Sequence, residues 1–302
     1  SAFGYSALKY NSTGHRYAAF GYRSLQNNTS GNYNVAMGHQ TLASNTIGEF
    51  NIAIGDEALY SNTTGSRNTA VGRAALYNNT IGADNSAFGM YALLNNTTGI
   101  YNSAFGRGAL QSNSSGGANS AFGLESLYSN TSGQFNTAVG FESLRQNATG
   151  GNNSAFGSYA LRNNIAGGGN VAIGMGSLQT VNANNNTSVG YSALNANIAS
   201  ANSAFGYKSL FANTTGTQNS AFGFKALEAN TVASSNSAFG YFSLLTNTIG
   251  ANNTSVGYNN LRFNTTGSFN SGFGVNSLTG NTIGQHNTAF GYRTLFSNTT
   301  GS

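Results

Sequence analysis

Residues 85–101 read NSAFGMYALLNNTTGIY, and residues 102–118 return to the same pattern as NSAFGRGALQSNSSGGA. Both are copies of a motif close to N-[ST]-A-F-G-x-x-[AS]-L-x-x-N-T-x-G-x-x. The first glycine of the motif occurs 18 times, and the interval between occurrences is 17 residues in all but two cases, which are 16 residues long and lie in 174–206. A fixed period of this kind is the sign of a repeat architecture. We therefore predict one continuous array over residues 1–302, with register shifts at 174–206 and no separate globular domain.

Two apolar columns run through every copy of the motif. The residue before the first glycine is always apolar, and leucine always stands four residues after that glycine. Representative members are Phe3, Phe20, Phe88, Phe105 and Phe290 in the first column and Leu8, Leu25, Leu42 and Leu295 in the second. A disordered low-complexity chain has no reason to hold two apolar columns in register, so the pattern predicts an ordered fold.

Asparagine and glycine fill further fixed columns. One asparagine opens the motif, as at Asn34 and Asn51, and a second follows the leucine by three residues, as at Asn11 and Asn28. An amide carries both donors and an acceptor, so stacked asparagines can form hydrogen-bonded ladders. The first glycines, such as Gly4, Gly21 and Gly38, and the glycine of each later turn are expected to supply a positive φ or a close backbone approach.

The spacing predicts a fold made of strands and not of helices. The two apolar positions lie five residues apart, whereas a helix needs apolar residues at spacings of three and four. Each copy instead contains two short pieces that we expect to be extended, N-S-A-F-G and A-L-x-x-N. Such pieces are stable only if each pairs with its equivalent in the next coil, about 4.8 Å away. The predicted fold class is all-β, a parallel β-solenoid of 18 coils of about 17 residues.

Composition excludes several classes of protein. The chain has 302 residues, 12 Lys+Arg and 7 Asp+Glu, which makes it 6% charged where soluble domains carry roughly 25%. It has no cysteine, so disulfides, thiolate metal sites and cysteine nucleophiles are excluded. No apolar run reaches the roughly 18 residues that span a bilayer, and no signal-peptide pattern opens the sequence. The net charge of +5 comes from scattered residues, so we expect neither a nucleic-acid partner nor membrane insertion of this segment.

No arrangement of residues points to catalysis. His15, His39 and His286 stand at different positions of the repeat, and Asp56 and Glu57 have no second acid in their columns. Paired carboxylates across a cleft, or a nucleophile beside a base, are therefore not expected. We predict that the protein is not an enzyme and has no cofactor and no metal site.

The strand pattern favours self-association. Neighbouring residues on a strand point to opposite faces, so the small Ala column and the bulky Phe column face opposite ways. An exposed Phe stripe along every coil would be an interface, and we therefore expect assembly along the axis, as a homotrimer, a head-to-tail filament or both. The alternative is a wide monomeric solenoid in which Phe and Leu share one lumen.

The repeats also resemble a known family. Asn51-Ile52-Ala53-Ile54-Gly55 and the similar segment 170–174 look like the head-repeat motif of trimeric autotransporter adhesins, and segment 68–82 is similar to repeats of bacterial surface and phage tail-fibre proteins. The resemblance covers the whole chain, although the repeat here is longer than the usual head repeat. It implies a left-handed β-roll assembled as a homotrimer, displayed on the cell surface or in an extracellular fibre, and used for attachment to a surface ligand or glycan.

Three features suggest other roles. A threonine follows the second asparagine in most copies, and such ladders on flat faces occur in ice-binding solenoids; a structural hydroxyl ladder is the alternative. N-x-[ST] sequons make Asn62, Asn213 and Asn298 possible glycan acceptors, although the composition alone also generates them. The column after the first glycine is often aromatic and either stacks on sugars or packs in an interface. The main prediction is a structural fibre or adhesin shaft, and the alternative is an ice-binding or glycan-binding solenoid.

Overall fold

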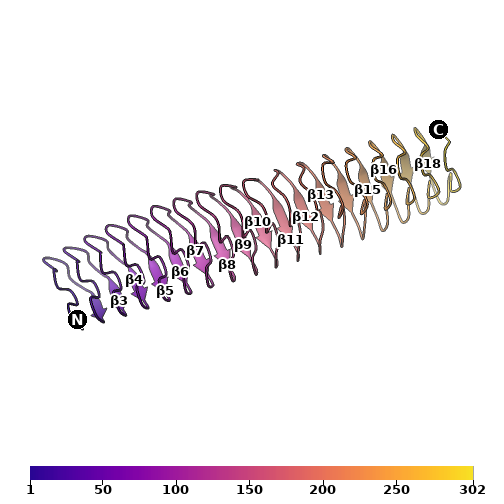
Figure 1. The fold of residues 1–302 in the computed structure, drawn as a ribbon. Coiled ribbons are helices and arrows are strands. Elements are labelled where there is room, and N and C mark those ends of the chain that lie inside the picture. Colours follow the sequence, from indigo (N-terminus) through magenta and orange to yellow (C-terminus); the bar gives the residue numbers. More distant parts are fainter. Residues whose placement is uncertain (302) are drawn as a thin grey trace. The chain divides into compact units, whose positions relative to one another are not determined.

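The computed structural model describes residues 1–301. The chain divides into two compact units, the first over residues 1–152 and the second from residue 153 onward. Each unit is a stack of coils in which one short strand per coil pairs in parallel with the strand of the next coil (Figure 1). No helix occurs between residues 1 and 301. The prediction of an all-β parallel solenoid is therefore confirmed for each unit, whereas the prediction of one continuous array stays a prediction.

The strands are short and regularly spaced. Those of the first unit are β1 (Ala2–Phe3), β2 (Ala18–Phe20), β3 (Val35–Met37), β4 (Ile52–Ile54), β5 (Thr69–Val71), β6 (Ser86–Phe88), β7 (Ser103–Phe105), β8 (Ser120–Phe122) and β9 (Thr137–Val139). Those of the second unit are β10 (Ser154–Phe156), β11 (Val171–Ile173), β12 (Thr187–Val189), β13 (Ser203–Phe205), β14 (Ser220–Phe222), β15 (Ser237–Phe239), β16 (Thr254–Val256), β17 (Ser271–Phe273) and β18 (Thr288–Phe290).

Equivalent residues of successive copies pair with one another. Ala87 lies opposite Ala104 in the pair β6–β7, and the two 16-residue copies keep this rule, since Ala172 lies opposite Ser188 and Ser188 opposite Ala204. The predicted register shifts are therefore absorbed outside the strands. This placement preserves the alignment of the inward and outward columns, which a one-residue slip within a strand would exchange.

The second predicted extended piece, A-L-x-x-N, is wrong: this part of the coil is a run of turns. Its leucine has a φ between 48° and 53°, the left-handed region, and is fully buried in the inner coils, as at Leu25 and Leu93. That conformation costs roughly 1–2 kcal/mol, while burying a leucine contributes about 1.5–3 kcal/mol. The free energy gained by burying the leucine therefore outweighs the cost of its left-handed conformation. The resulting bend closes the coil within 17 residues.

The lumen of each coil is narrow and holds small side chains, leucine and asparagine. The middle residue of each inner strand, usually alanine, is fully buried, as are the leucine and both asparagine columns. The lumen therefore contains buried amides in every coil, and each amide needs partners to offset its loss of hydration.

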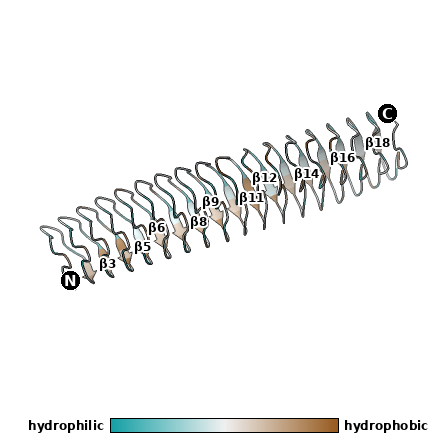
Figure 2. Cartoon of the chain, viewed as in Figure 1, coloured by the Kyte–Doolittle hydropathy of each residue, from teal (hydrophilic) through white to brown (hydrophobic). Residues whose placement is uncertain are grey.

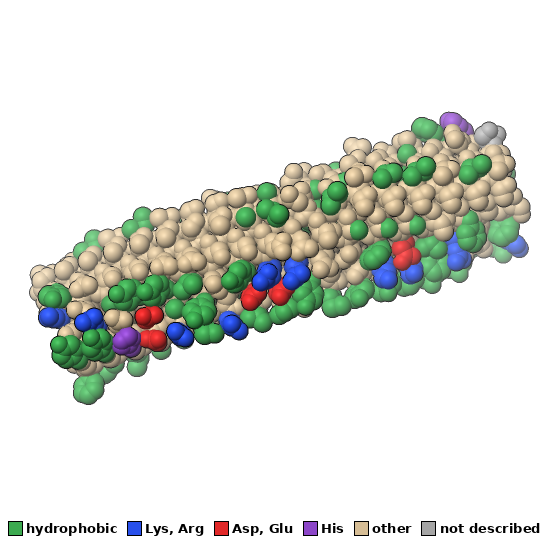
Figure 3. Space-filling model, viewed as in Figure 1, with side chains coloured by type: hydrophobic (Ala, Val, Ile, Leu, Met, Phe, Trp, Pro, Cys, Tyr) green, Lys and Arg blue, Asp and Glu red, His purple; other side chains and the backbone are tan. Residues whose placement is uncertain are grey.

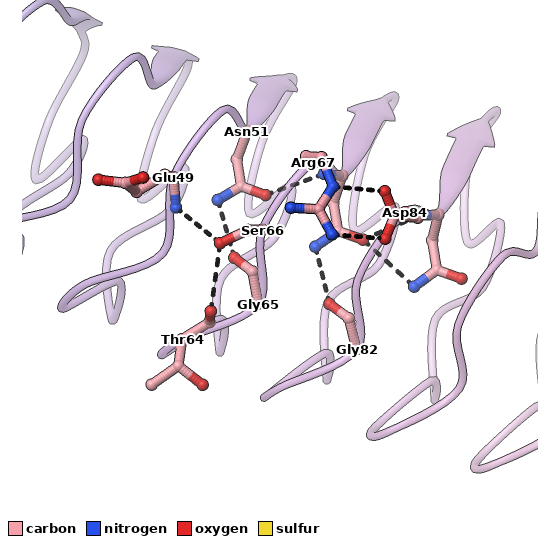
Figure 4. A network of polar contacts seen from close by, with 10 residues as sticks. Glu49, Asn51, Thr64, Gly65, Ser66, Arg67, Gly82 and Asp84 are labelled. Carbon is pink, nitrogen blue, oxygen red and sulfur yellow. Dashed lines mark hydrogen bonds and ion pairs between the residues drawn. The ribbon is translucent and has the colours of Figure 1, made fainter.

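The buried asparagines satisfy one another and a shared carbonyl. The Nδ2 of Asn79 donates to the Oδ1 of Asn62 at 2.9 Å and to the carbonyl of Gly82 at 2.9 Å. The other column converges on the same carbonyl, because Nδ2 of Asn68 donates to Gly82 O at 2.8 Å while Asn51 Oδ1 accepts the N–H of Asn68 at 3.0 Å (Figure 4). The predicted asparagine ladders are confirmed, and a turn glycine such as Gly82 or Gly99 provides the acceptor that joins the two columns.

The two glycine columns are required for different reasons. The first glycines have φ values from +117° to +142°, which L-residues rarely adopt, and a Cβ on Gly106 would lie 2.5 Å from the carbonyl oxygen of Gly123. The turn glycines have no positive φ, but a Cβ on Gly14 would lie 2.7 Å from both Asn11 Oδ1 and Gly31 O. The first glycines thus combine a positive φ with a close backbone approach, whereas the turn glycines are required by close approach alone.

The Phe column faces outward. Phe20 is 40% exposed and Phe88 36% exposed, whereas the alanine before each of them is fully buried. The alternative in which Phe and Leu share a lumen is therefore wrong. The lumen is filled by Ala, Leu and Asn, which leaves no room for a ring. Figure 2 shows that strands such as β3 and β11, whose outward side chains are Val, Met and Ile, are hydrophobic throughout.

Candidate functional site

The exposed side of the strands is the most distinctive surface of each unit. We call it the outer strand face; it consists of the first and third side chains of every strand. The third position is Phe, Met, Ile or Val in every strand of three residues, and the first position is Ser, Thr, Val, Ile or Ala. Figure 3 shows hydrophobic side chains gathered in rows on the drawn surface, with basic and acidic side chains among them.

Aromatic rings on the outer strand face stack on one another. In the first unit, the centroids of Phe88 and Phe105 are 4.7 Å apart and those of Phe105 and Phe122 are 4.8 Å apart, with interplanar angles of 7° and 6°. In the second unit, Phe205, Phe222 and Phe239 stack at 4.6 and 4.9 Å. The coil spacing imposes this geometry, because equivalent residues of paired parallel strands lie about 4.8 Å apart.

None of the 19 charged residues lies in a strand. They stand in the turns, where Arg67 and Asp84 form a bidentate pair with Nε–Oδ1 2.6 Å and Nη2–Oδ2 2.8 Å (Figure 4). The hydrogen bond from Arg67, together with its charge, lowers the pKa of Asp84 although burial opposes this shift. The charge pattern thus leaves the outer strand face uncharged along each unit, with an apolar column at the third position and mostly Ser or Thr at the first.

The ion pair between Arg67 and Asp84 should make the stability of the fold depend slightly on pH. A carboxylate whose pKa is lowered in the folded state stabilises that state above its unfolded pKa, and the gain is lost as pH falls through the folded pKa. We expect Asp84→Asn to lower the melting temperature slightly at neutral pH and to match the parent chain in strong acid. The effect is small because exposed ion pairs contribute little. Thermal melting of both chains across this range is the measurement, and a difference that grows in acid would contradict the assignment.

The histidines do not come together. His15 Nδ1 lies 3.3 Å from the carbonyl of Thr13, and His286 stacks on Phe269 with centroids 5.1 Å apart. His39 Nδ1 lies 2.9 Å from Asp56 Oδ1, on the surface. Among residues 1–301, no group of three His, Cys, Asp or Glu side chains could hold a metal ion, and no pocket is found.

The threonine column lies in a bend, where its hydroxyls are used within the fold. Thr29 Oγ1 donates to the carbonyl of Thr46 at 3.0 Å, and Thr46 Oγ1 donates to that of Thr63 at 3.0 Å. These threonines are half-buried. A hydroxyl whose hydrogen is bonded to the next coil has no donor left for water or ice, so the arrangement disfavours the ice-binding alternative.

Two of the three possible glycan acceptors are buried. Asn62 and Asn213 are fully buried, and each Nδ2 makes two hydrogen bonds, to the asparagine of the preceding coil and to the carbonyl three residues ahead. A glycan on either nitrogen would have to replace those bonds. Asn298 is half-buried and its Nδ2 makes two long contacts, 3.4 and 3.5 Å, to Asn281 Oδ1 and Gly301 O.

The other predicted ladder residues lie as the columns require. Leu25, Leu42, Asn28, Asn34 and Asn51 are fully buried. Members of the outermost coils are more exposed, since each such coil has a described neighbour on one side: Phe3 is 76%, Phe290 66% and Leu295 46% exposed, and Leu8 and Asn11 are half-buried.

The sequence pattern does not predict two columns of variable residues that adopt a positive φ. They include Ser6, Arg23 and Gln40 in one and Arg16, Tyr33 and Phe50 in the other, with φ between 53° and 60°. Residue type gives no signal there, because glycine and asparagine do not predominate. Only the need to close the coil explains these conformations.

Comparison with known proteins does not extend the assignment. No protein-family model matches the chain, and no curated protein matches it significantly. Between residues 1 and 301 there is also no helix long and apolar enough to cross a membrane. The outer strand face is the candidate functional site because it carries a continuous apolar column and no charged residue.

Proposed function

We propose that this protein is a structural element of an extracellular fibre or adhesin, in which copies of the chain pack together through the outer strand face. The observation that carries the proposal is an uncharged face on which a column of Phe, Met, Ile and Val continues from coil to coil and stays exposed or half-buried in a single chain. Monomers rarely leave contiguous apolar patches open to water, and the core of a protein interface is depleted of charge.

The contacts between successive coils support a structural role for the protein. Each coil is tied to the next by parallel backbone hydrogen bonds and by buried amide ladders, and stability in such arrays comes mainly from contacts between adjacent repeats. We propose no catalytic role, because the charged side chains of the described coils lie dispersed over the turns. The resemblance of the repeats to adhesin heads supports a homotrimer and an extracellular location.

A charge placed on the outer strand face tests the proposal. We expect Phe105→Lys to dissociate the assembly, because a lysine in a packed apolar interface loses its hydration without a partner. The matched control is Tyr101→Lys, at a residue that is 62% exposed, lies outside the strands and belongs to a column that contains arginine in other coils. The measurement is the molar mass of each variant by light scattering after size-exclusion chromatography.

A second variant covers the case in which Phe105→Lys fails to fold. The chain has no cysteine, so Phe105→Cys can form only an intermolecular disulfide. We expect covalent dimers with Phe105→Cys under mild oxidation and none with Tyr101→Cys. Unchanged mass in Phe105→Lys, or equal cross-linking at both positions, would overturn the proposal.

A further inference from the structure

A second aromatic ladder lies in the second unit, in the column that follows the first glycine. It consists of Tyr191, Tyr207, Phe224, Tyr241 and Tyr258, and we call it the five-ring ladder. Successive ring centroids are 5.4, 5.1, 5.0 and 5.5 Å apart, with interplanar angles of 8° to 13°. Each ring is 37–47% exposed. The ladder is thus a continuous aromatic strip that passes over five coils and does not belong to the outer strand face.

The stacking decides which part of each ring a ligand can reach. The faces of the three inner rings lie against the rings of the neighbouring coils. Phe242 also packs tilted against Phe224 and Tyr241, with centroids 5.7 and 4.2 Å away. The parts that remain exposed are therefore the other edges and, in the tyrosines, the hydroxyls. Sugars stack on the faces of aromatic rings, and those faces are not available here. Ring edges carry the positive end of the quadrupole and favour edge-to-face contact with a π-face. A flat conjugated ligand lying along the ladder would meet one such edge in every coil.

The charge of the second unit favours an anionic ligand. The second unit has five basic side chains and one acidic one, Glu228. Lys208 Nζ lies 5.6 Å from the ring centroid of Tyr207, and Lys225 lies next to Phe224 in the chain, with its Nζ 3.2 Å from Glu228 Oε2. The shorter stack of the first unit, Tyr5–Tyr22–His39, is followed in its column by Asp56 instead of a ring.

We infer that the five-ring ladder is a binding site for elongated, planar, anionic aromatic molecules that lie along the coil axis. The ligand's π-face contacts successive ring edges, and its anionic groups are attracted to Lys208 beside the ladder and to the net positive charge of the unit. The inference does not depend on self-association through the outer strand face, because the two ladders occupy different columns of the repeat.

Titration of the full chain with Congo red, a flat bis-azo disulfonate, tests the inference. We expect saturable binding that Phe224→Ser weakens by about tenfold or more, because the change removes the central rung and its edge-to-face contacts. Serine is compatible with the fold at this position, since Ser158 occupies the same column. The matched control, Tyr22→Ser, breaks the stack of the first unit and should leave the affinity unchanged. Thioflavin T, which is planar but cationic, should bind more weakly than Congo red.

Three outcomes would overturn the inference. They are no saturable binding of Congo red, equal affinity in the parent chain and Phe224→Ser, and loss of binding in Phe222→Ser but not in Phe224→Ser. The last result would place the dye on the outer strand face. Molar mass measured on the same samples separates these outcomes from a failure of self-association.

Discussion

Replacing one buried ladder asparagine by aspartate, in Asn96→Asp, is expected to destabilise its coils by about 3–5 kcal/mol at neutral pH, because it leaves an uncompensated charge in the lumen, as removal of one partner from a buried ion pair does. The Nδ2 of Asn96 donates to Asn79 Oδ1 at 2.7 Å and to Gly99 O at 3.0 Å. An aspartate at this position would direct a carboxylate oxygen at two acceptors in a fully buried site.

The loss should depend on pH with a definite sign. Burial and the surrounding acceptors raise the pKa of the introduced carboxyl in the folded state, while in the unfolded chain it stays near 3.9. Unfolding then releases a proton between these values, so the stability of Asn96→Asp should fall as pH rises above about 4. Thermal melting at several pH values measures this, and a melting temperature that rises with pH relative to the parent chain would be inconsistent with a buried carboxyl.

The control for Asn96→Asp is Asn96→Val. Valine occurs naturally in this column as Val181, which is fully buried. It removes these two hydrogen bonds, and also the one that Asn113 Nδ2 donates to Asn96 Oδ1 at 2.8 Å, without introducing a charge. We therefore expect a loss of roughly 1–3 kcal/mol with no pH dependence. If valine were as damaging as aspartate, shape and not hydrogen bonding would determine this column.

Gly106→Ala is expected to be the other severe substitution, with a loss above about 4 kcal/mol and local unfolding of the adjoining coils. The φ of Gly106 is 136°, and the added Cβ would lie 2.5 Å from Gly123 O and 2.7 Å from Gly123 C. Neither atom can move without breaking the parallel pairing of β7 and β8. Hydrogen exchange of the amides between residues 103 and 123, followed by thermal melting, is the measurement.

Gly108→Ala is the matched control two residues away. Gly108 has φ 66°, and the nearest atom to an added Cβ is Gln111 Oε1 at 3.2 Å, at the end of a flexible side chain. Ala74 occupies the same column with φ 52°. We expect a loss of about 1 kcal/mol, the cost of the left-handed conformation alone. Similar losses for the two variants would show that the approach of neighbouring backbones does not explain the first glycine column.

The sequence predicts those features that every coil repeats. The invariant leucine and the nearly invariant asparagine mark positions where one side chain meets its own copy in the next coil. Burial at Leu93 and hydrogen bonding at Asn96 therefore follow from periodicity alone. The outward direction of Phe88 does not, because alternation on a strand separates Ala from Phe without saying which of them faces the lumen. Lumen volume decides this, and it depends on how tightly the rest of the coil bends.

That bend is what the residue pattern fails to reveal. Leu93 and Tyr91 both adopt positive φ, at 52° and 63°, although neither residue type favours it. A reading based on propensity therefore assigns an extended piece where the structure has turns. The same limit applies to the two ring ladders. The columns predict which residues stack, as for Phe88 and Phe105 on the outer strand face. Only the coil geometry shows that Tyr207 and Phe224 of the five-ring ladder expose ring edges and not ring faces.

The mass of the unmodified protein in solution tests the central claim most directly. A single chain has a mass of 31.1 kDa. If the outer strand face is an interface between copies, sedimentation equilibrium should give an integer multiple of that mass, three copies if the resemblance to adhesin heads extends to assembly. A mass of one chain at every concentration studied, with the outer strand face open to water, would contradict the account.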